Sequence, residues 1–376
     1  MPWRGANRVS AARRMFSELS NALGMVPADF VRALGERGVA CSEREARQVL
    51  SRLISEGLND PTPRREARKA LIAAIHQHLR WDRPEVVERV PDSEGKSVRY
   101  LFRLHDGQLV EAVRIGLHKE NCFTVCLSSQ VGCAMACDFC ATGRLGLTRN
   151  LEAWEIVATF LILRDEAPGR VTGAVFMGQG EPFHNYDQVI QAAHVLRDPA
   201  GGRIPGDAIT ISTVGLVPQL RRYAREGHPF RLIVSLSSAI PERRLTLLPV
   251  AGRTPLPELV SALHEYAAVA KSRLTLAWVL MAGVNDGDDE IAALKEALVG
   301  LPYQLNLIDV NDARPDGYAR LPEPELRELI TRLQALKVPI VRRYSVGRDE
   351  NSACGMLAAI STSSRTPSPP PAPPRS

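Results

Sequence analysis

The sequence has no uninterrupted run of 18 or more apolar residues, which is about the length that a membrane-spanning helix needs. Its first residues, MPWRGANRVSAARRMF, also lack the apolar core of a secretory signal, so we expect no export. Hydrophobic residues make up 45% and charged residues 24% of the 376 positions, which excludes collagen, a coiled coil and general disorder. We therefore expect a globular, cytoplasmic protein that does not bind membranes.

Little net charge remains when 47 basic residues are set against 42 acidic ones, and the balance is +5. Residues 1–90 hold 16 Lys and Arg against 11 Asp and Glu, so the whole excess lies there. A basic N-terminal region is what a polyanionic partner would require. Arginine-rich helices are also common in proteins without such a partner, and the composition alone leaves both interpretations open.

Cysteine is scarce outside one short segment, because five of the seven cysteines fall between positions 122 and 140. An odd count in a chain without a secretory signal favours a metal or redox site over a disulfide framework. The tightest group has the spacing C-x3-C-x2-C and consists of Cys133, Cys137 and Cys140. Three thiolates suit an iron–sulfur cluster with one open iron. A structural zinc ion is the alternative, and its fourth ligand could come from His118, Cys122 or Cys126.

Apolar, β-branched runs alternate with amphipathic stretches six times. The runs are 121–128, 172–177, 208–213, 231–236, 273–280 and 304–309. The stretches are 151–165, 186–197, 216–226, 255–271, 289–300 and 324–337. This pattern predicts an α/β fold of βαβ units around a parallel sheet, and six repeats rather than eight indicate a partial barrel. The cysteine segment follows the first strand, at the end of the sheet where such folds place their chemistry.

The remaining chain is predicted in three parts. Residues 1–90 are expected to form a basic helical domain, which could bind a polyanionic partner. Residues 91–120 contain two alternating runs around His105-Asp106-Gly107, which is typical of a β-hairpin, and Glu111 lies on the returning strand. The barrel is expected over 121–358, and the Pro- and Ser-rich segment 361–376 is expected to be disordered.

Several longer motifs then become informative together. They are CLSSQVGC at 126–133, CATG at 140–143, RNL at 149–151, MGQGEP at 177–182, GVND at 283–286 and SACG at 352–355. These motifs and the cysteine spacing resemble the radical S-adenosylmethionine (radical SAM) dual-specificity RNA methyltransferases. That family methylates carbon 2 of an adenine in ribosomal RNA and in certain tRNAs, and a sister group methylates carbon 8. The resemblance covers roughly residues 93–358.

The resemblance implies a partial (βα)6 radical SAM barrel with one [4Fe-4S] cluster and two molecules of SAM used per turnover. One SAM would methylate Cys354, and the second would give the radical that takes hydrogen from that methyl group. Glu111 would remove the ring proton of the adenine, and Cys126 would release the product by forming a disulfide with Cys354. The cluster ligands would be Cys133, Cys137 and Cys140.

The same resemblance implies partners and cofactor contacts. The partners would be RNA and an electron donor such as flavodoxin or ferredoxin, and we expect a monomer. The residues that match SAM contacts of the family are Gly180, Glu181, Ser212, Ser235, Leu236, Ser237 and Asn311.

Three places depart from the family pattern, and the N-terminal region lacks its usual aromatic residues. At one of them, residues 347–351 (GRDEN) replace the family's Arg-Gly-Asp-Asp-Ile stretch. Ser237 stands where the family has a histidine, and Ala277 stands where it usually has a glutamate. We interpret the chain as a divergent paralogue, and the RNA and the adenine that it modifies stay open.

Three alternatives are kept. A carbon-8 methylase would have the same fold, and a zinc-stabilised RNA-binding protein would have no catalytic role. A radical SAM enzyme for a small molecule is disfavoured, because only the methyl-cysteine route needs both Cys126 and Cys354.

Overall fold

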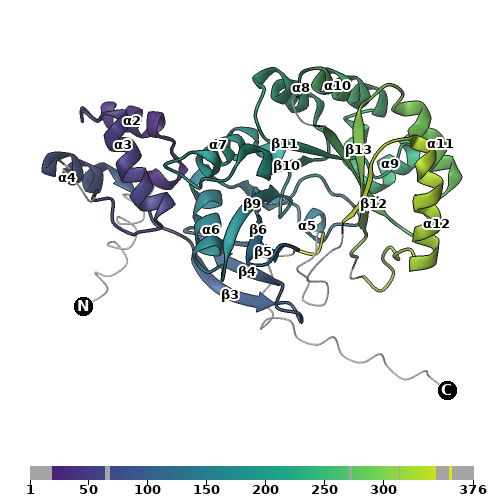
Figure 1. Cartoon of the computed structure of the whole chain (residues 1–376), viewed down its shortest axis with the longest axis horizontal. Helices are drawn as coiled ribbons and strands as arrows, with labels where there is room; N and C mark the ends of the chain where they lie inside the picture. The colour runs from purple at the N-terminus through teal and green to yellow at the C-terminus, as the bar shows by residue number, and fades with distance from the viewer. Residues whose placement is uncertain (1–18, 64–67, 271–272, 313, 344–354, 358–376) are drawn as a thin grey trace, which may run out of the picture.

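A computed structural model describes residues 19–63, 68–270, 273–312, 314–343 and 355–357. A group of helices near the N-terminus lies at one end of the molecule, and the larger α/β part lies at the other (Figure 1). Cys354 and the predicted disordered segment 361–376 lie outside the described residues. No helix in the described ranges is long and apolar enough to cross a membrane.

The larger part is built on a ten-stranded sheet with the order β14-β13-β12-β11-β10-β9-β6-β5-β4-β3. Its parallel portion confirms all six predicted strands: β6 (Cys122–Cys126), β9 (Arg170–Phe176), β10 (Ile209–Thr213), β11 (Arg231–Ser235), β12 (Leu274–Leu280) and β13 (Tyr303–Asp309). A further parallel strand that the sequence analysis did not predict, β14 (Ile340–Arg343), pairs with β13. The partial-barrel fold class is therefore confirmed, with one strand more than expected.

Helices connect the parallel strands at nearly the predicted bounds. They are α6 (Ala153–Asp165), α7 (Tyr186–Arg197), α8 (Val217–Glu226), α10 (Leu256–Val269), α11 (Asp288–Ala297) and α12 (Glu323–Leu333), with the shorter α9 (Pro241–Leu247) after β11. Local sequence sets their ends: Glu152 and Glu155 form a capping box before α6, and Gly227 in a left-handed conformation ends α8.

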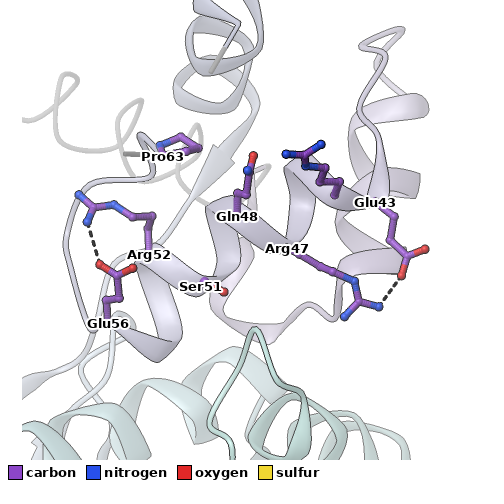
Figure 2. Close-up of a pocket in the computed structure, with 8 residues that line it drawn as sticks. Glu43, Arg47, Gln48, Ser51, Arg52, Glu56 and Pro63 are labelled. Atoms are coloured by element: carbon purple, nitrogen blue, oxygen red, sulfur yellow. Dashed lines mark hydrogen bonds and ion pairs between the residues drawn. The ribbon is translucent and has the colours of Figure 1, made fainter. Parts of the chain in front are cut away.

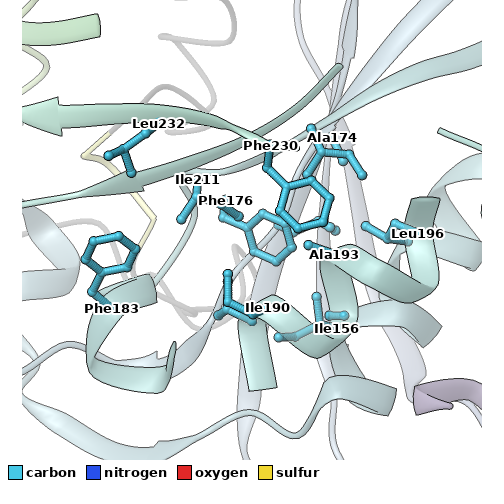
Figure 3. Close-up of a cluster of buried hydrophobic side chains, with 14 of the residues drawn as sticks. Ile156, Ala174, Phe176, Phe183, Ile190, Ala193, Leu196, Ile211, Phe230 and Leu232 are labelled. Carbon is cyan, nitrogen blue, oxygen red and sulfur yellow. The ribbon is translucent and has the colours of Figure 1, made fainter. Parts of the chain in front are cut away.

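The core lies between the sheet and these helices. Figure 3 shows Phe176 from β9 and Phe230 before β11 packed towards Ile190 and Ala193 of α7. The strands and helices that frame the site are thus fixed by apolar contacts, each fully buried side chain contributing about 1.5–3 kcal/mol.

An antiparallel extension continues the sheet beyond β6. It consists of β3 (Glu85–Pro91), β4 (Ser97–Arg103) and β5 (Leu109–Gly116), and β5 pairs with β6. The hairpin of β4 and β5 is the predicted one, with Gly107 at φ +88° in its turn. The strand β3 was not predicted, and it crosses the expected boundary between residues 90 and 91. The domain division itself stays a prediction.

The N-terminal helices are α2 (Pro27–Gly35), α3 (Glu43–Leu50) and α4 (Lys69–His78). A capping box of Ser42 and Glu45 starts α3, and a π-helical turn over Ser51–Ser55 follows it. This part is attached to α7 because Gln191 donates hydrogen bonds to the Gly24 carbonyl (3.0 Å) and to Asp29 (2.7 Å).

Candidate active site

The three clustered cysteines lie on the loop between two short strands, β7 (Gln130–Gly132) and β8 (Leu147–Asn150), with the short helix α5 (Ala141–Arg144) before β8. The loop closes at its base because the Cys133 amide donates to the Gly146 carbonyl at 2.8 Å. A Cβ atom on Gly132 would lie 1.9 Å from that same oxygen, and Gly132 has φ +76°. Only glycine therefore fits at the start of the loop.

The cysteine thiols sit in an apolar enclosure. Cys133 and Cys137 pack with Met135, Val214, Leu247, Leu248, Met281 and Val310. Burial raises the pKa of Cys133 to about 12. The pKa of Cys137 is also raised well above its ordinary value. Burial is the main cause, and electrostatic repulsion from Cys140 and Cys133 adds to it. Thiolates held close together in such surroundings need a compensating positive charge, as bound iron would provide.

Three thiols on one loop are a donor set that suits a cluster with three cysteine ligands. Within the described ranges, no three or more His, Cys, Asp or Glu side chains lie close enough together to hold a metal ion. The roles of Cys133, Cys137 and Cys140 as ligands thus stay a prediction that rests on their chemistry and shared loop.

A basic residue from the far side of the barrel holds the cysteine loop. Arg314, which follows β13, contacts the Asp138 carboxylate at 3.3 Å and its carbonyl at 3.2 Å. The buried Asp312 carboxylate holds Arg314 in turn at 2.6 Å. Hydrogen bonding to Arg314 keeps the pKa of Asp138 below its usual range. This contact between Arg314 and Asp138, which we call the clasp, was not predicted from the sequence because the two residues lie 176 positions apart.

Glu181 follows β9 and is buried with its carboxylate fully engaged. One oxygen accepts hydrogen bonds from the Phe183 amide (2.8 Å) and the Thr213 hydroxyl (2.6 Å), and the other accepts from the Val214 amide (2.9 Å). Burial raises the pKa of Glu181 to about 7, although these hydrogen bonds oppose the rise. The carboxylate thus joins the loop after β9 to the loop after β10.

The other predicted SAM contacts come from the carboxyl ends of the parallel strands, as expected for this fold. Ser212 is the penultimate residue of β10 and Ser235 ends β11, while Asn311 follows β13 and accepts a hydrogen bond from Arg320. Leu236 and Ser237 follow β11 and are fully buried, and Gly180 adopts φ +102° beside Gln130. The structure brings these residues to one edge of the sheet, and their contact with SAM stays a prediction.

Ser237 is one of the departures from the family pattern noted above. It has φ +57°, and its hydroxyl has no hydrogen-bond partner among the described residues. Its carbonyl accepts a hydrogen bond from Asn285 at 2.7 Å, so the backbone here is held in place without the histidine.

Glu111 and Cys126 point to the same face of the sheet. Val113 pairs with Cys126 across β5 and β6, and Glu111 lies two residues before Val113. Every second side chain of a strand lies on the same face, and residues paired across two strands share that face. The side chains of Glu111 and Cys126 therefore project from the same face of the sheet. Glu111 is 2% exposed and ion-paired to the buried Arg99.

The short described segment after Cys354 docks on this region. Leu357 packs against Cys126 and Val113, and its carbonyl accepts a hydrogen bond from the Thr142 hydroxyl at 2.6 Å. The Gly355 carbonyl accepts a hydrogen bond from the amide of Ala141 at 2.7 Å, and Ala141 directly follows Cys140 on the cysteine loop.

Comparisons with known proteins agree with this arrangement. A family model described as the radical SAM superfamily matches residues 127–294. A protein of Anaeromyxobacter sp. named "Probable RNA methyltransferase" is 49% identical, over 86% of this chain and 95% of its own length. The "Dual-specificity RNA methyltransferase RlmN" of Syntrophotalea carbinolica is 36% identical over 85% of both chains. A crystal structure of a radical SAM methyltransferase from Sphaerobacter thermophilus superposes with a TM-score of 0.82 and 35% identity, covering 91% of this chain and 100% of that one.

A cysteine loop after the first strand of a partial barrel defines the radical SAM class of enzymes, which use a [4Fe-4S] cluster and SAM. Within that class, the chain belongs to the family of RNA methyltransferases that includes the RlmN proteins.

Proposed function

We propose that the protein methylates carbon 2 of an adenine in RNA through a methyl group carried on Cys354. A bound [4Fe-4S] cluster and SAM would supply the radical that activates this methyl group. The observation that carries the proposal is the docking of Gly355 and Leu357 between the cysteine loop and Cys126. Cys354 directly precedes Gly355 in the sequence, and this adjacency connects it to the docked segment.

Two further residues have roles in the proposed reaction. Glu111, held by its ion pair with Arg99, removes the proton from the ring carbon once the methyl group is attached. Cys126 then bonds to the Cys354 sulfur as the bond between that sulfur and the transferred carbon breaks, and the carbon takes up a proton to become the methyl group. The disulfide leaves the methylated RNA free, and the electron left over from the radical addition would pass to the oxidised cluster. The shared face of Glu111 and Cys126 supports the action of both residues on one substrate.

The N-terminal helices would provide the electrostatic contact with RNA. A recess of about 720 Å³ is lined by Arg47, Arg52, Gln48 and their neighbours on and after α3. Figure 2 shows these side chains. Glu43 and Glu56 pair with two of these arginines, whereas the adjoining Arg44 extends the basic surface. Such contacts with phosphates are independent of sequence and weaken with salt.

The experiment is anaerobic reconstitution with iron and sulfide, followed by incubation with SAM, a one-electron donor such as flavodoxin or ferredoxin, and a pool of ribosomal RNA and tRNA. Mass spectrometry of the nucleosides should find 2-methyladenosine. Cys354→Ala should give no product, and Cys126→Ala should accumulate a covalent protein–RNA adduct, whose sequencing identifies the RNA.

Cys122→Ala is the matched control, because Cys122 lies on the same strand and has no proposed role. It should leave both product and adduct formation as in the unmodified protein. The product 8-methyladenosine would contradict the proposed position. A preparation that holds zinc but neither iron nor sulfide would contradict the proposed chemistry.

A further inference from the structure

A second recess lies beside the proposed catalytic residues, with a volume of about 340 Å³. Its walls come from the β4–β5 turn, from the β7–β8 hairpin and from Gln179. Gly132, which directly precedes the first cluster cysteine, lines it, and so does Leu109, two residues before Glu111. The volume is within the range of about 300–1,000 Å³ that small-ligand sites occupy.

Gln179, which is among the residues that line this recess, carries a polar group with no partner. The residue is 1% exposed, and its Nε2 has no hydrogen-bond partner in the described part of the chain. Its Oε1 accepts a hydrogen bond from the Glu111 amide at 3.1 Å. Because that amide can only donate, the carbonyl oxygen of Gln179 must face it, and the orientation of the side chain is settled. Two N–H donors are left buried without an acceptor, which proteins avoid unless a ligand supplies one.

The backbone of Gln179 is held as tightly as its side chain. Its amide donates to the Ser128 hydroxyl at 2.8 Å, and its carbonyl accepts from the Ser129 amide at 2.7 Å. The Ser128 hydroxyl in turn donates to the Glu111 carbonyl at 2.5 Å. Gln179 and Glu111 are therefore parts of one rigid hydrogen-bonded unit.

We propose that Gln179 recognises an adenine base of the RNA in this recess. The Nε2 donors would bond ring nitrogen N7, and the second lone pair of Oε1 would accept from the exocyclic amino group, a pairing that glutamine makes with adenine. Guanine would place its O6 against Oε1, where two acceptors repel. Leu109, Val131 and the half-exposed Leu145 offer apolar surface for the base.

This inference rests on the proposed function and deepens it, because it assigns the residue that selects the base. The edge of adenine that carries N7 and the amino group lies across the ring from carbon 2. A base bound in this way keeps the proposed methylation position free to react.

The test measures binding of the reconstituted protein to three fluorescent RNA 12-mers at 50 mM salt by fluorescence anisotropy. The probes are oligo(A), oligo(7-deaza-A), which stacks in the same way but lacks the N7 acceptor, and oligo(U). The unmodified protein should bind oligo(A) about tenfold more tightly than either of the others.

Two variants remove the donors of Gln179 in different ways. Gln179→Glu keeps an oxygen for the Glu111 amide, and Gln179→Leu removes all polar atoms. Both should bind oligo(A) only as tightly as oligo(7-deaza-A), with binding to oligo(U) within twofold of the unmodified protein for Gln179→Leu. Gln334→Glu places the same new charge on the exposed surface after α12 and should keep the tenfold preference. Melting curves and iron content establish that each variant is folded and loaded.

A preference for oligo(A) that survives in both Gln179 variants overturns the inference, and so do equal affinities of the unmodified protein for oligo(A) and oligo(7-deaza-A). The proposed function is tested separately by methyladenosine formation. Product formed together with a preference that does not depend on Gln179 overturns only the role of Gln179. A preference that depends on Gln179 without any methyladenosine overturns only the proposed function.

Discussion

Replacing Glu181 by glutamine should change how the stability of the protein depends on pH. Burial raises the pKa of Glu181 from 4.5 to about 7 in the folded chain. The fold therefore favours the neutral acid, and the stability that this group contributes is present below pH 4.5 and is lost as the pH rises through 7. Proton linkage between these two values gives a loss of about 2.5 kcal/mol between pH 5 and pH 8. The glutamine variant cannot titrate and should lack this loss.

The assay is urea denaturation of cluster-free protein, followed by tryptophan fluorescence at half-unit steps from pH 5 to pH 8. In Glu181→Gln, an NH2 group faces the Val214 N–H, and the two donors cannot bond. This lowers the free energy of unfolding by an amount that does not depend on pH, so it cancels when only the pH dependence is compared. All other titrating groups are common to both proteins. The free energy of unfolding of the unmodified protein minus that of the variant should fall by about 2.5 kcal/mol across the range. A difference that stays flat, or that grows with pH, would refute the reasoning.

Three other changes test the surroundings of the site. Arg314→Met releases the clasp on Asp138 and should weaken iron retention against a chelator about tenfold, whereas unchanged retention would show that the clasp is dispensable. Gly132→Ala puts a methyl group 1.9 Å from the Gly146 oxygen and should lower the melting temperature more than Gly38→Ala, which has a similar φ of +73° and open space around it. Phe230→Ala empties a fully buried site and should cost about 3–5 kcal/mol in urea denaturation, and a cost below 1 kcal/mol would mean that the core closes over the gap.

The parallel strands were predictable because burial on both faces leaves an unbroken apolar run. In β12, for example, the run Leu274–Leu280 is apolar at nearly every position and is buried almost throughout. The strands that were missed are those without this signature. In β14, Ile340 and Val341 are followed by two arginines, and Arg342 is compensated by Glu323 and Asp309, which only the folded chain brings near. β3 mixes charged and apolar residues without a regular alternation and has no fully buried position, as suits an edge strand.

The candidate site likewise has a part that could be predicted from the sequence and a part that could not. The cysteine spacing is local, so the loop could be located from the sequence before any contact was known. Gln179 lies within a recognised motif, but its importance comes from Ser128 and Glu111, which are 51 and 68 positions away. The clasp of Arg314 on Asp138 is likewise a contact between distant segments. Spacing along the chain shows which residues share a loop, whereas pairings between loops appear only when the sheet has formed.

The hydrogen bond from Thr142 to Leu357 joins residues that are 215 positions apart. A ribosome that adds about 5–20 residues per second needs about 10–40 s to cover that distance. During this interval the cysteine loop has been synthesised, but the segment that will lie against it does not yet exist. Biosynthesis therefore gives iron and sulfide a period of open access to the loop, which ends when the last part of the chain arrives and docks.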